Sequence, residues 1–352
     1  MHSVSRGLEL IVTMVNNEPP RSLVGRLSVA MCTYNGAGFL SQQLNSILSQ
    51  TELPDELVVC DDGSTDDTVS ILEAFAASAP FVVCIHRNVE RLKSAQNFAK
   101  CFSFCSGDVI VITDQDDVWF PDRIANTRAA FANDPALTFT FSDAPLIDDH
   151  GNDLGRTLYS SLQTVQRDRK HYERGTCLLQ VILRCGAIYG CTMAFRANLL
   201  PLILPIPEMW GHDGWVAVVL SAVGPSARLS PVTHYRQHPR QFAGAGNWKT
   251  KTRFEKTSSA RAKRYESEIR LHELAIDAVQ SKSELRQLLL PALHERLRFL
   301  HKRLDVRLGG LHELPSLVRL LYGGDYNRHG SGFTSALKDL LRLLAVLPES
   351  RQ

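Results

Sequence analysis

From residue 27 onward, short runs of apolar and often β-branched residues alternate with longer stretches whose apolar residues lie three or four apart. The first pattern predicts buried strands, and the second predicts helices that pack on a sheet. Strands are expected at 27–34, 57–60, 81–85 and 108–113, with helices at 38–50, 69–75 and 94–105 between them. This order predicts the α/β class, with a mostly parallel sheet covered by helices on both faces.

Beyond residue 117 the spacing is less regular. A helix is expected at 121–131, a strand at 137–141, further elements at 187–195 and 215–223, and an irregular polar segment at 148–174. A long loop inside a compact domain is more often a binding segment than a linker. After residue 247 the pattern changes to long Leu, Arg, Glu and Lys helices, for example 260–279 and 285–306. We therefore expect a disordered leader at 1–26, a catalytic body at 27–247 and a C-terminal helical region at 248–352.

The composition is that of an ordinary globular protein, with 44% hydrophobic and 22% charged residues among 352. The net charge of +2 is unevenly distributed, because the chain from Lys251 onward carries +7 and the preceding part −5. An acidic body is suited to hold a cation, and a basic tail is attracted to anionic surfaces. The eight cysteines form no CxxC pair, which favours buried free thiols over a zinc site. No apolar run approaches the roughly 18 residues that span a bilayer.

Three polar motifs follow predicted strands. They are Cys32-Thr33-Tyr34-Asn35, Asp61-Asp62-Gly63-Ser64 and Asp114-Gln115-Asp116-Asp117. Ligands of open parallel sheets bind at the carboxyl ends of the strands, so these loops are expected to converge. Each motif alone is also typical of a turn or a helix N-cap.

The aspartates after the fourth strand point more specifically to a cation site. Three carboxylates within four residues repel one another unless a cation or hydrogen-bond donors compensate them. Oxygen ligands without neighbouring His or Cys favour Mg²⁺ or Mn²⁺, which commonly bridge to substrate phosphates.

Together these motifs resemble the inverting family-2 glycosyltransferases, which have the GT-A fold. The resemblance covers roughly residues 27–245 and divides the body into a nucleotide-sugar half, 27–118, and an acceptor half, 119–247. Further motifs are similar to the bacterial rhamnosyltransferase-like branch. They are Asp114-Gln115-Asp116-Asp117-Val118-Trp119, Gly190-Cys191-Thr192, His212-Asp213-Gly214-Trp215 and Tyr235-Arg236-Gln237-His238, with Leu321-Tyr322-Gly323-Gly324-Asp325-Tyr326 and Ala336-Leu337-Lys338-Asp339 in the tail.

The resemblance implies roles for the donor-side residues. Tyr34 would stack on the nucleotide base, and Asp62 would accept a hydrogen bond from the imide N–H of uracil or thymine, which implies a UDP- or dTDP-sugar. Asp114 would contact the ribose or donor sugar and the metal, and Asp116 would bind Mg²⁺ or Mn²⁺. Asp117 would act indirectly. Thr33, Gly190 and Arg236 complete the expected nucleotide-sugar site.

An inverting transfer also needs a base that deprotonates the acceptor hydroxyl. The resemblance assigns this role to Asp213, which is also expected to be the N-cap of the helix that follows. His212 stands where many relatives have Glu. His238 is the expected third metal ligand, but the chain continues with Pro239-Arg240-Gln241 where relatives commonly have Gly-Asn-Asn.

The resemblance thus implies a metal-dependent transferase that moves rhamnose or another hexose from a dTDP- or UDP-sugar to a growing, lipid-linked bacterial surface glycan. Two alternatives are a nucleotidyltransferase on a related fold and a non-enzymatic receiver-like signalling module. Residues 32–38 contain no Lys or Arg for a nucleotidyltransferase phosphate loop, and no later strand supplies the lysine of a receiver.

The expected location is the cytoplasm, with the tail at the inner face of the plasma membrane. Its basic residues and the stripe Leu297, Leu300 and Leu304 fit helices on an anionic leaflet. Helices packed within the protein would produce the same pattern. Nucleic acid is not an expected partner, because the positive charges are interleaved with acids.

Overall fold

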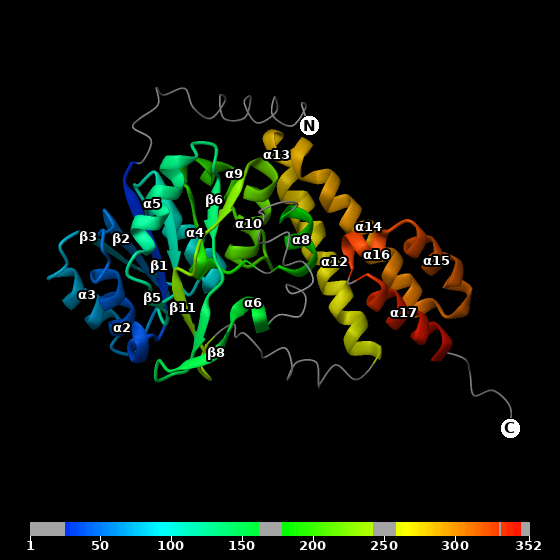
Figure 1. Cartoon of the computed structure of the whole chain (residues 1–352), viewed down its shortest axis with the longest axis horizontal. Coiled ribbons are helices and arrows are strands. Elements are labelled where there is room, and N and C mark those ends of the chain that lie inside the picture. Colours follow the sequence, from blue (N-terminus) through cyan, green and yellow to red (C-terminus); the bar gives the residue numbers. More distant parts are fainter. Residues whose placement is uncertain (1–24, 162–177, 187, 242–257, 331, 346–352) are drawn as a thin grey trace. The chain divides into compact units, whose positions relative to one another are not determined.

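The computed structural model describes residues 25–161, 178–186, 188–241, 258–330 and 332–345 (Figure 1). Contacts divide the described chain into two compact units. The first contains the strands and the helices that cover them. The second contains the C-terminal helices together with Leu179–Gly186 and Pro207–Met209. The predicted leader, except for residues 25 and 26, and the predicted boundary at residue 247 lie outside the described residues.

The first unit is built on a seven-stranded sheet in the order β10-β6-β9-β4-β1-β2-β3. Its strands are β1 (Leu27–Thr33), β2 (Glu56–Asp61), β3 (Val82–Arg87), β4 (Val109–Thr113), β6 (Phe139–Phe141), β9 (Ala194–Arg196) and β10 (Ser226–Arg228). Strands β1 to β4 pair in parallel, whereas β9 is antiparallel to both β4 and β6. The predicted mostly parallel sheet is confirmed, with one antiparallel strand inserted into it.

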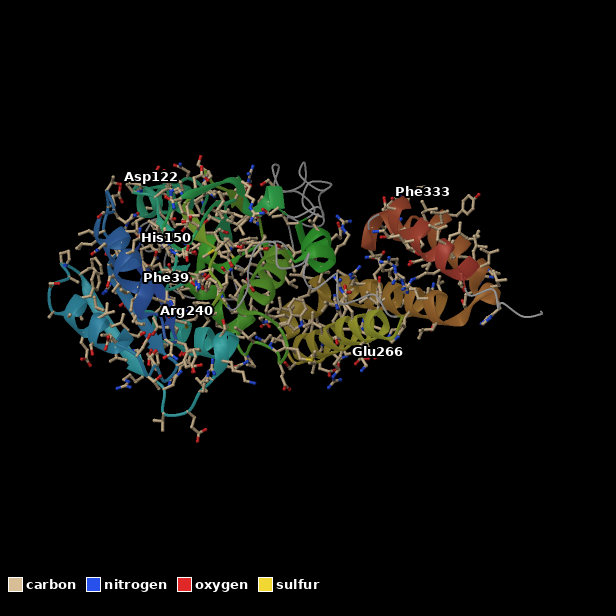
Figure 2. The ribbon with its side chains drawn as sticks, turned by 90° about the horizontal axis from the view of Figure 1, so that it is seen from below. Phe39, Asp122, His150, Arg240, Glu266 and Phe333 are labelled. Atoms are coloured by element: carbon tan, nitrogen blue, oxygen red, sulfur yellow. The ribbon has the colours of Figure 1, made fainter. Side chains whose placement is uncertain are left out.

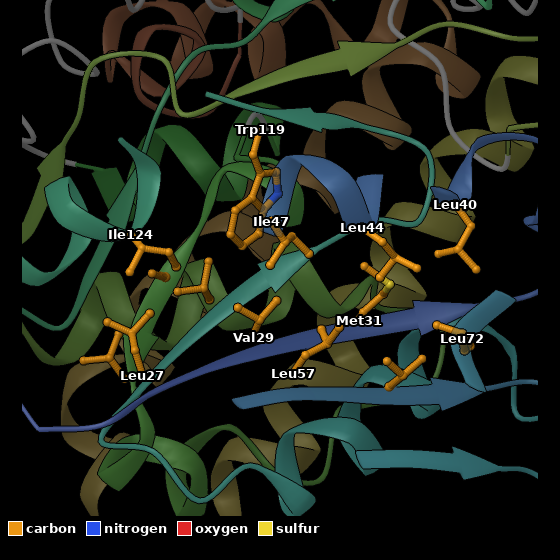
Figure 3. Close-up of a cluster of buried hydrophobic side chains, with 14 of the residues drawn as sticks. Leu27, Val29, Met31, Leu40, Leu44, Ile47, Leu57, Leu72, Trp119 and Ile124 are labelled. Atoms are coloured by element: carbon orange, nitrogen blue, oxygen red, sulfur yellow. The ribbon is translucent and has the colours of Figure 1, made fainter. Parts of the chain in front are cut away.

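Alternation along β1 decides which residues face which helices. Leu27, Val29 and Met31 belong to one buried cluster with Leu40 and Leu44 of α2, as Figure 3 shows. The residues between them on β1 point to the other face, because successive side chains of a strand alternate. Helix α4 packs on that face against β1 and β2. The sheet is therefore covered on both sides.

The helices of the first unit follow the predicted pattern with small shifts at their ends. They are α2 (Ala37–Leu48), α3 (Thr68–Ala76), α4 (Lys93–Phe104), α5 (Arg123–Asn133), α6 (Leu158–Ser161), α9 (Leu200–Ile203) and α10 (His212–Val223), with 3-10 turns at Gly190–Thr192 and Ala197–Leu199. Helix α8 (Leu178–Cys185) lies almost entirely in the second unit.

A four-stranded sheet in the order β5-β11-β7-β8 lies beside the acidic loop in sequence and space. Its strands are β5 (Val118–Trp119), β11 (Thr233–Arg236), β7 (Pro145–Ile147) and β8 (Asp153–Thr157). The expectation of an irregular segment from residue 148 is wrong as far as residue 161, because β8 and α6 lie there. Strand β8 is polar and largely exposed, so it has none of the apolar alternation that marks a half-buried strand.

The second unit consists of helices with a core of its own. The helices are α12 (Ser258–Gln280), α13 (Ser283–Leu288), α14 (Leu290–Gly309), α15 (Leu314–Tyr322), α16 (Asp325–His329) and α17 (Phe333–Ala345), with a 3-10 turn at Leu311–Glu313. The single helix expected at 285–306 is broken at residue 289, because Pro291 lies in the first turn of α14 and cannot continue a preceding helix. Across the described parts of the chain, every helix is too short or too polar to cross a membrane.

Candidate active site

The acidic loop, Asp114–Asp117, connects β4 to β5. Strand β4 is fully buried, and its carboxyl end lies beside the ends of β1 and β9. Among the described residues, one group has potential metal-ligand atoms all within 4.8 Å of one another: Asp114, Asp117 and Cys191. The strand order therefore brings the predicted aspartates to the expected edge of the sheet.

The crowding of these acids changes their ionisation. Burial raises the pKa of Asp114 well above its usual range, and the charges of Asp117 and Asp116 raise it further. Burial, followed by the charge of Asp116, raises the pKa of Asp117 to about 7. A cation bound here would reverse both effects, because it would stabilise the ionised carboxylates. The electrostatics of the loop are those of a site that favours a positive ion.

A buried cation, Arg123, lies next to the strand that precedes the acidic loop. Arg123 of α5 donates to the backbone oxygen of Ile112 at 2.8 Å, and its guanidinium lies 4.0 Å from the ring centroid of Trp119. Burial lowers the pKa of Arg123 to about 10, while Cys191 and the two acids oppose that decrease. Arg123 thus offsets part of the negative charge and anchors β4 to α5.

Asp116 points to a different partner. Its Oδ2 lies 2.8 Å from Nε2 of His238, just beyond β11, and the His238 side chain is only 6% exposed. The ring of Phe39 backs this histidine at 4.4 Å between centroids, and Arg240 lies 5.9 Å from the same phenyl ring (Figure 2). The structure therefore joins two of the three predicted metal ligands, although they are 122 residues apart in the chain.

Arg236 is buried and fixes the acidic loop. Its backbone N–H donates to Oδ1 of Asp117 at 3.0 Å, and its Nε donates to the backbone oxygen of Asp116 at 2.7 Å. The remaining guanidinium nitrogens donate to the backbone oxygens of Asp148 and Asp149 and to the side chain of Gln42. Since these donors point to protein acceptors, the geometry favours a positioning role over direct contact with a nucleotide sugar.

Tyr34 lies at the end of β1, next to the acidic loop. Its backbone N–H donates to Oε1 of Gln115 at 2.9 Å, and the Nε2 of Gln115 donates back to the Tyr34 carbonyl at 3.2 Å. Tyr34 is 37% exposed, and the guanidinium of Arg91 lies 3.7 Å from the centroid of its ring. A flat, accessible ring is thus tied to the loop that carries the acids.

Two adjacent aspartates at the end of β2 have different surroundings. Asp61 accepts from Thr33 at 2.9 Å and from the backbone N–H of Ser64 at 2.9 Å, so it shapes the turn. Asp62 accepts from the backbone N–H groups of Leu92 and Lys93 at 2.7 and 2.9 Å, and from Asn88 at 2.9 Å. A carboxylate has about four acceptor positions, so these three donors leave one, and Nε of Arg91 lies 3.8 Å from Oδ2 of the buried Asp62. Thr33 is 2% exposed, and its hydroxyl donates to Asp61 instead of facing the surface.

The expected base, Asp213, lies in the first turn of α10 and is half-buried. It is not the N-cap: Gly211 holds that position, and Asp213 accepts from the backbone N–H of Gly214 at 2.7 Å. A Cβ built on Gly190 would lie 3.4 Å from Cβ of Asp213, and the adjacent Cys191 lies with Asp114 and Asp117, so Asp213 is near the acidic loop.

His212 lies against the same turn that carries Cys191. Its buried ring stacks on Phe98 at 3.8 Å between centroids, and burial lowers its pKa. A Cβ added to Gly190 would lie 2.6 Å from Nε2 of His212 and 3.4 Å from Cβ of Asp213. Gly190 therefore matters for the close packing of α10 on the 3-10 turn at Gly190–Thr192.

The structure thus gathers the predicted residues around one edge of the sheet and adds four that the sequence pattern does not single out. These are Gln115, Arg123, Cys191 and Arg91. Cys191 lies inside the Gly190-Cys191-Thr192 motif, but its apolar neighbours are those of an inert buried thiol. Gln115 lies inside the Asp114–Asp117 motif, but its partner Tyr34 is distant in the chain, so the motif gives it no role. Arg123 and Arg91 are polar residues that no local pattern marks.

A mixed α/β sheet with an acidic loop at the carboxyl end of a central strand is the arrangement found in the GT-A fold. Residues 28–188 match the family model described as glycosyl transferase family 2.

Among curated proteins, the chain is similar to the dTDP-rhamnosyl transferase RfbG of Shigella flexneri, with 37% identity over 100 residues. The match covers 27% of this chain and 35% of that protein. A second relative is the UDP-Glc:alpha-D-GlcNAc-diphosphoundecaprenol beta-1,3-glucosyltransferase WfaP of Escherichia coli, 30% identical over 118 residues, or 33% of this chain and 45% of that protein. The chain thus spans less than half the length of either relative.

Among solved structures, S. aureus TarS 1-349 in complex with UDP-GlcNAc has a TM-score of 0.50 at 15% identity. The match covers 86% of this chain and 81% of that one. At this level of identity the likeness concerns the fold.

Proposed function

We propose that this protein is a metal-dependent inverting glycosyltransferase that moves a sugar from a dTDP- or UDP-sugar to a lipid-linked, growing bacterial glycan. The observation that carries the proposal is the acidic loop at the end of β4, where Asp114 and Asp117 lie together and Asp116 faces His238. The name of RfbG supports a dTDP-rhamnose donor, and that of WfaP supports a diphosphate-linked lipid acceptor.

The pair of Asp116 and His238 fits a hard divalent ion. Adjacent ligands of an octahedral Mg²⁺ or Mn²⁺ lie about 3 Å apart, because each lies at 2.0–2.1 Å from the ion. The 2.8 Å between Asp116 Oδ2 and His238 Nε2 agrees with that spacing. The carboxylate of Asp114 lies with Asp117 and Cys191, so it would have to move toward this pair to supply a further oxygen. Such an ion, when bound, neutralises the charge of the departing diphosphate.

The remaining residues would orient the reactants. The ring of Tyr34 would stack on the pyrimidine, and the remaining acceptor position of Asp62 would receive its imide N–H. Asp213 would take the proton of the acceptor hydroxyl while that oxygen bonds to the anomeric carbon and the bond to the diphosphate breaks. Its place beside Gly190, in the turn that carries Cys191, supports this assignment.

An Asp116→Asn variant tests the metal site. We expect wild-type protein to bind UDP or dTDP in calorimetry more tightly with Mn²⁺ than with EDTA, and the variant to lose that difference while its circular dichroism spectrum is unchanged. Asp122→Asn, which changes an exposed aspartate five residues beyond the acidic loop, is the control. Equal metal dependence in Asp116→Asn and wild type would refute the assignment.

A donor screen tests the substrate class. Saturation-transfer NMR with UDP- and dTDP-sugars should show transfer to the pyrimidine protons of both nucleotides and stronger transfer to the sugar protons of the true donor. Signals from purine nucleotides alone would contradict the role given to Asp62.

A further inference from the structure

Helices α15 and α17 of the second unit pack against each other, and each leaves a row of apolar side chains exposed. On α15, Leu317 and Leu320 enter the core, whereas the neighbouring positions remain at the surface. The exposed residues are Leu314, Val318, Leu321 and Tyr322 on α15, and Phe333, Leu337, Leu341 and Leu344 on α17. We call these eight residues the α15–α17 apolar rows.

The spacing of these residues is regular. Each row advances by mostly three or four positions, which keeps its side chains on one side of a helix. Tyr322 is 88% exposed and Phe333 is 70% exposed, and Figure 2 shows Phe333 projecting from its helix. Single exposed apolar residues are common on proteins, but rows of them on two neighbouring helices indicate a surface that binds something apolar.

The charges on these two helices point to the kind of partner. Arg319, Lys338 and Arg342 are the cationic residues of α15 and α17, and Asp339 is their one acid. Asp339 is fully buried, with Oδ2 2.7 Å from Arg303 and Oδ1 2.6 Å from Arg307. Both helices therefore present positive charge next to apolar side chains and no accessible carboxylate. A surface of this composition complements the anionic face of a bilayer.

We propose that α15 and α17 dock on an anionic lipid surface, with the α15–α17 apolar rows inserted between the headgroups and the cations in contact with lipid phosphates. The proposal replaces the Leu297, Leu300 and Leu304 stripe expected from the sequence. Leu300 is buried in the core of the second unit, and Leu297 and Leu304 pack against that core, so none of them is free to enter a membrane. The inference rests on the proposed function only in that a lipid-linked acceptor would lie at the same surface.

Vesicle sedimentation of the full chain tests the proposal. We expect binding to vesicles of phosphatidylglycerol and phosphatidylcholine, and little binding to phosphatidylcholine alone. The triple variant Tyr322→Gln, Phe333→Gln, Leu341→Gln should bind on the order of tenfold more weakly, because it removes inserted apolar area. A control triple variant, Leu48→Gln, Val82→Gln, Leu154→Gln, changes exposed apolar residues elsewhere and should bind as wild type does.

Two further measurements separate insertion of apolar side chains from a purely electrostatic attachment. Phe333→Trp should show a blue shift of its fluorescence on addition of anionic vesicles, beyond the change seen in wild type. The charge reversal Arg319→Glu, Lys338→Glu should reduce vesicle binding and leave donor-nucleotide binding unchanged. Since neither readout measures sugar transfer, failure of the proposed function would not hide the result.

The proposal is overturned if the full chain ignores anionic vesicles at low salt, or if both triple variants bind equally well. It is also overturned if the chain forms a dimer that the Tyr322, Phe333 and Leu341 triple variant dissociates while vesicle binding is absent. In that case the apolar rows would be an interface with a second copy.

Discussion

The aspartates of the candidate active site have the same side chain and very different environments. Asp61 is used within its own turn, Asp62 receives donors from the segment before α4, and Asp116 faces His238. Asp114 and Asp117 have raised pKa values because they are crowded and partly or fully buried. Identity alone does not assign a role, since each role depends on which neighbours the fold supplies.

The assignment of Asp213 as the base leads to a specific expectation. Asp213→Asn preserves shape and the hydrogen bond to the Gly214 N–H, but the amide cannot take a proton at neutral pH. We expect turnover to fall by roughly 10²- to 10⁴-fold, with unchanged nucleotide affinity in calorimetry. Asp67→Asn, at an exposed helix end, should be neutral. A loss of only a few-fold in Asp213→Asn would move the role to another residue.

Much of the site could be predicted at this scale, because strand ends and their polar residues are visible in the sequence. Tyr34, Asp62, Asp114 and Asp116 are identified in this way. The reciprocal hydrogen bonds between Tyr34 and Gln115 could not be predicted. The two residues are 81 positions apart, and nothing in the sequence around either residue indicates the other. The N-cap expected at Asp213 is wrong because helix α10 begins earlier, at His212.

At the scale of elements, the contact between α10 and the Gly190–Thr192 turn is tight enough to be tested. Gly190→Ala would place a methyl group 2.6 Å from Nε2 of His212, whose ring is held by Phe98. We expect a loss of about 1–3 kcal/mol in the free energy of unfolding, as for other overpacked sites.

The double variant Gly190→Ala, His212→Ala should show a favourable coupling of at least about 0.5 kcal/mol in a mutant cycle. Gly214→Ala is the matched control, because its added methyl would meet its nearest neighbour at 3.7 Å, an ordinary contact. Additive effects of Gly190→Ala and His212→Ala would show that the two residues do not press on each other.

The second unit is held together by an ion-pair network that connects α14 and α17. Asp339 pairs with Arg303 and Arg307 and accepts from Tyr326 at 3.0 Å. Asp339→Asn should cost about 3–5 kcal/mol in chemical denaturation, because it leaves two largely buried guanidinium groups without their counter-charge. Asp305→Asn changes an exposed aspartate of the same helix bundle and should have little effect. Equal stability of the two variants would contradict the network's importance.

This network also accounts for part of the sequence pattern. Tyr326 and Asp339 belong to the two tail motifs that resemble the rhamnosyltransferase-like branch, and both residues are buried in the same network. The helical character of the tail is predictable from its periodicity. The sequence does not predict which leucines face the core. Helices α14, α15 and α17 each have apolar residues on more than one side, and only the packing determines which of them are covered.

At the scale of the whole molecule, ligand binding should appear as added stability of the intact chain. A ligand that binds only the folded state at 100 times its Kd stabilises that state by about 2.7 kcal/mol. We expect UDP or dTDP to raise the unfolding midpoint further when Mn²⁺ is present than when EDTA is present. In Asp116→Asn the metal-dependent part of this increase should vanish. The same increase with and without metal would show that the nucleotide site does not require the ion.

The position of β9 has a consequence for how the chain folds during synthesis. Strand β4 is parallel to β1 on one side, and its other side is covered by β9, where Val111 pairs with Ala194. Ribosomes must therefore add about eighty residues before the apolar edge of β4 can find its partner. Until then the nascent chain presents an unpaired Val-Ile-Val-Ile segment, the kind of edge on which aggregation begins. The strand that carries the acidic loop thus waits for a partner that is synthesised about eighty residues later.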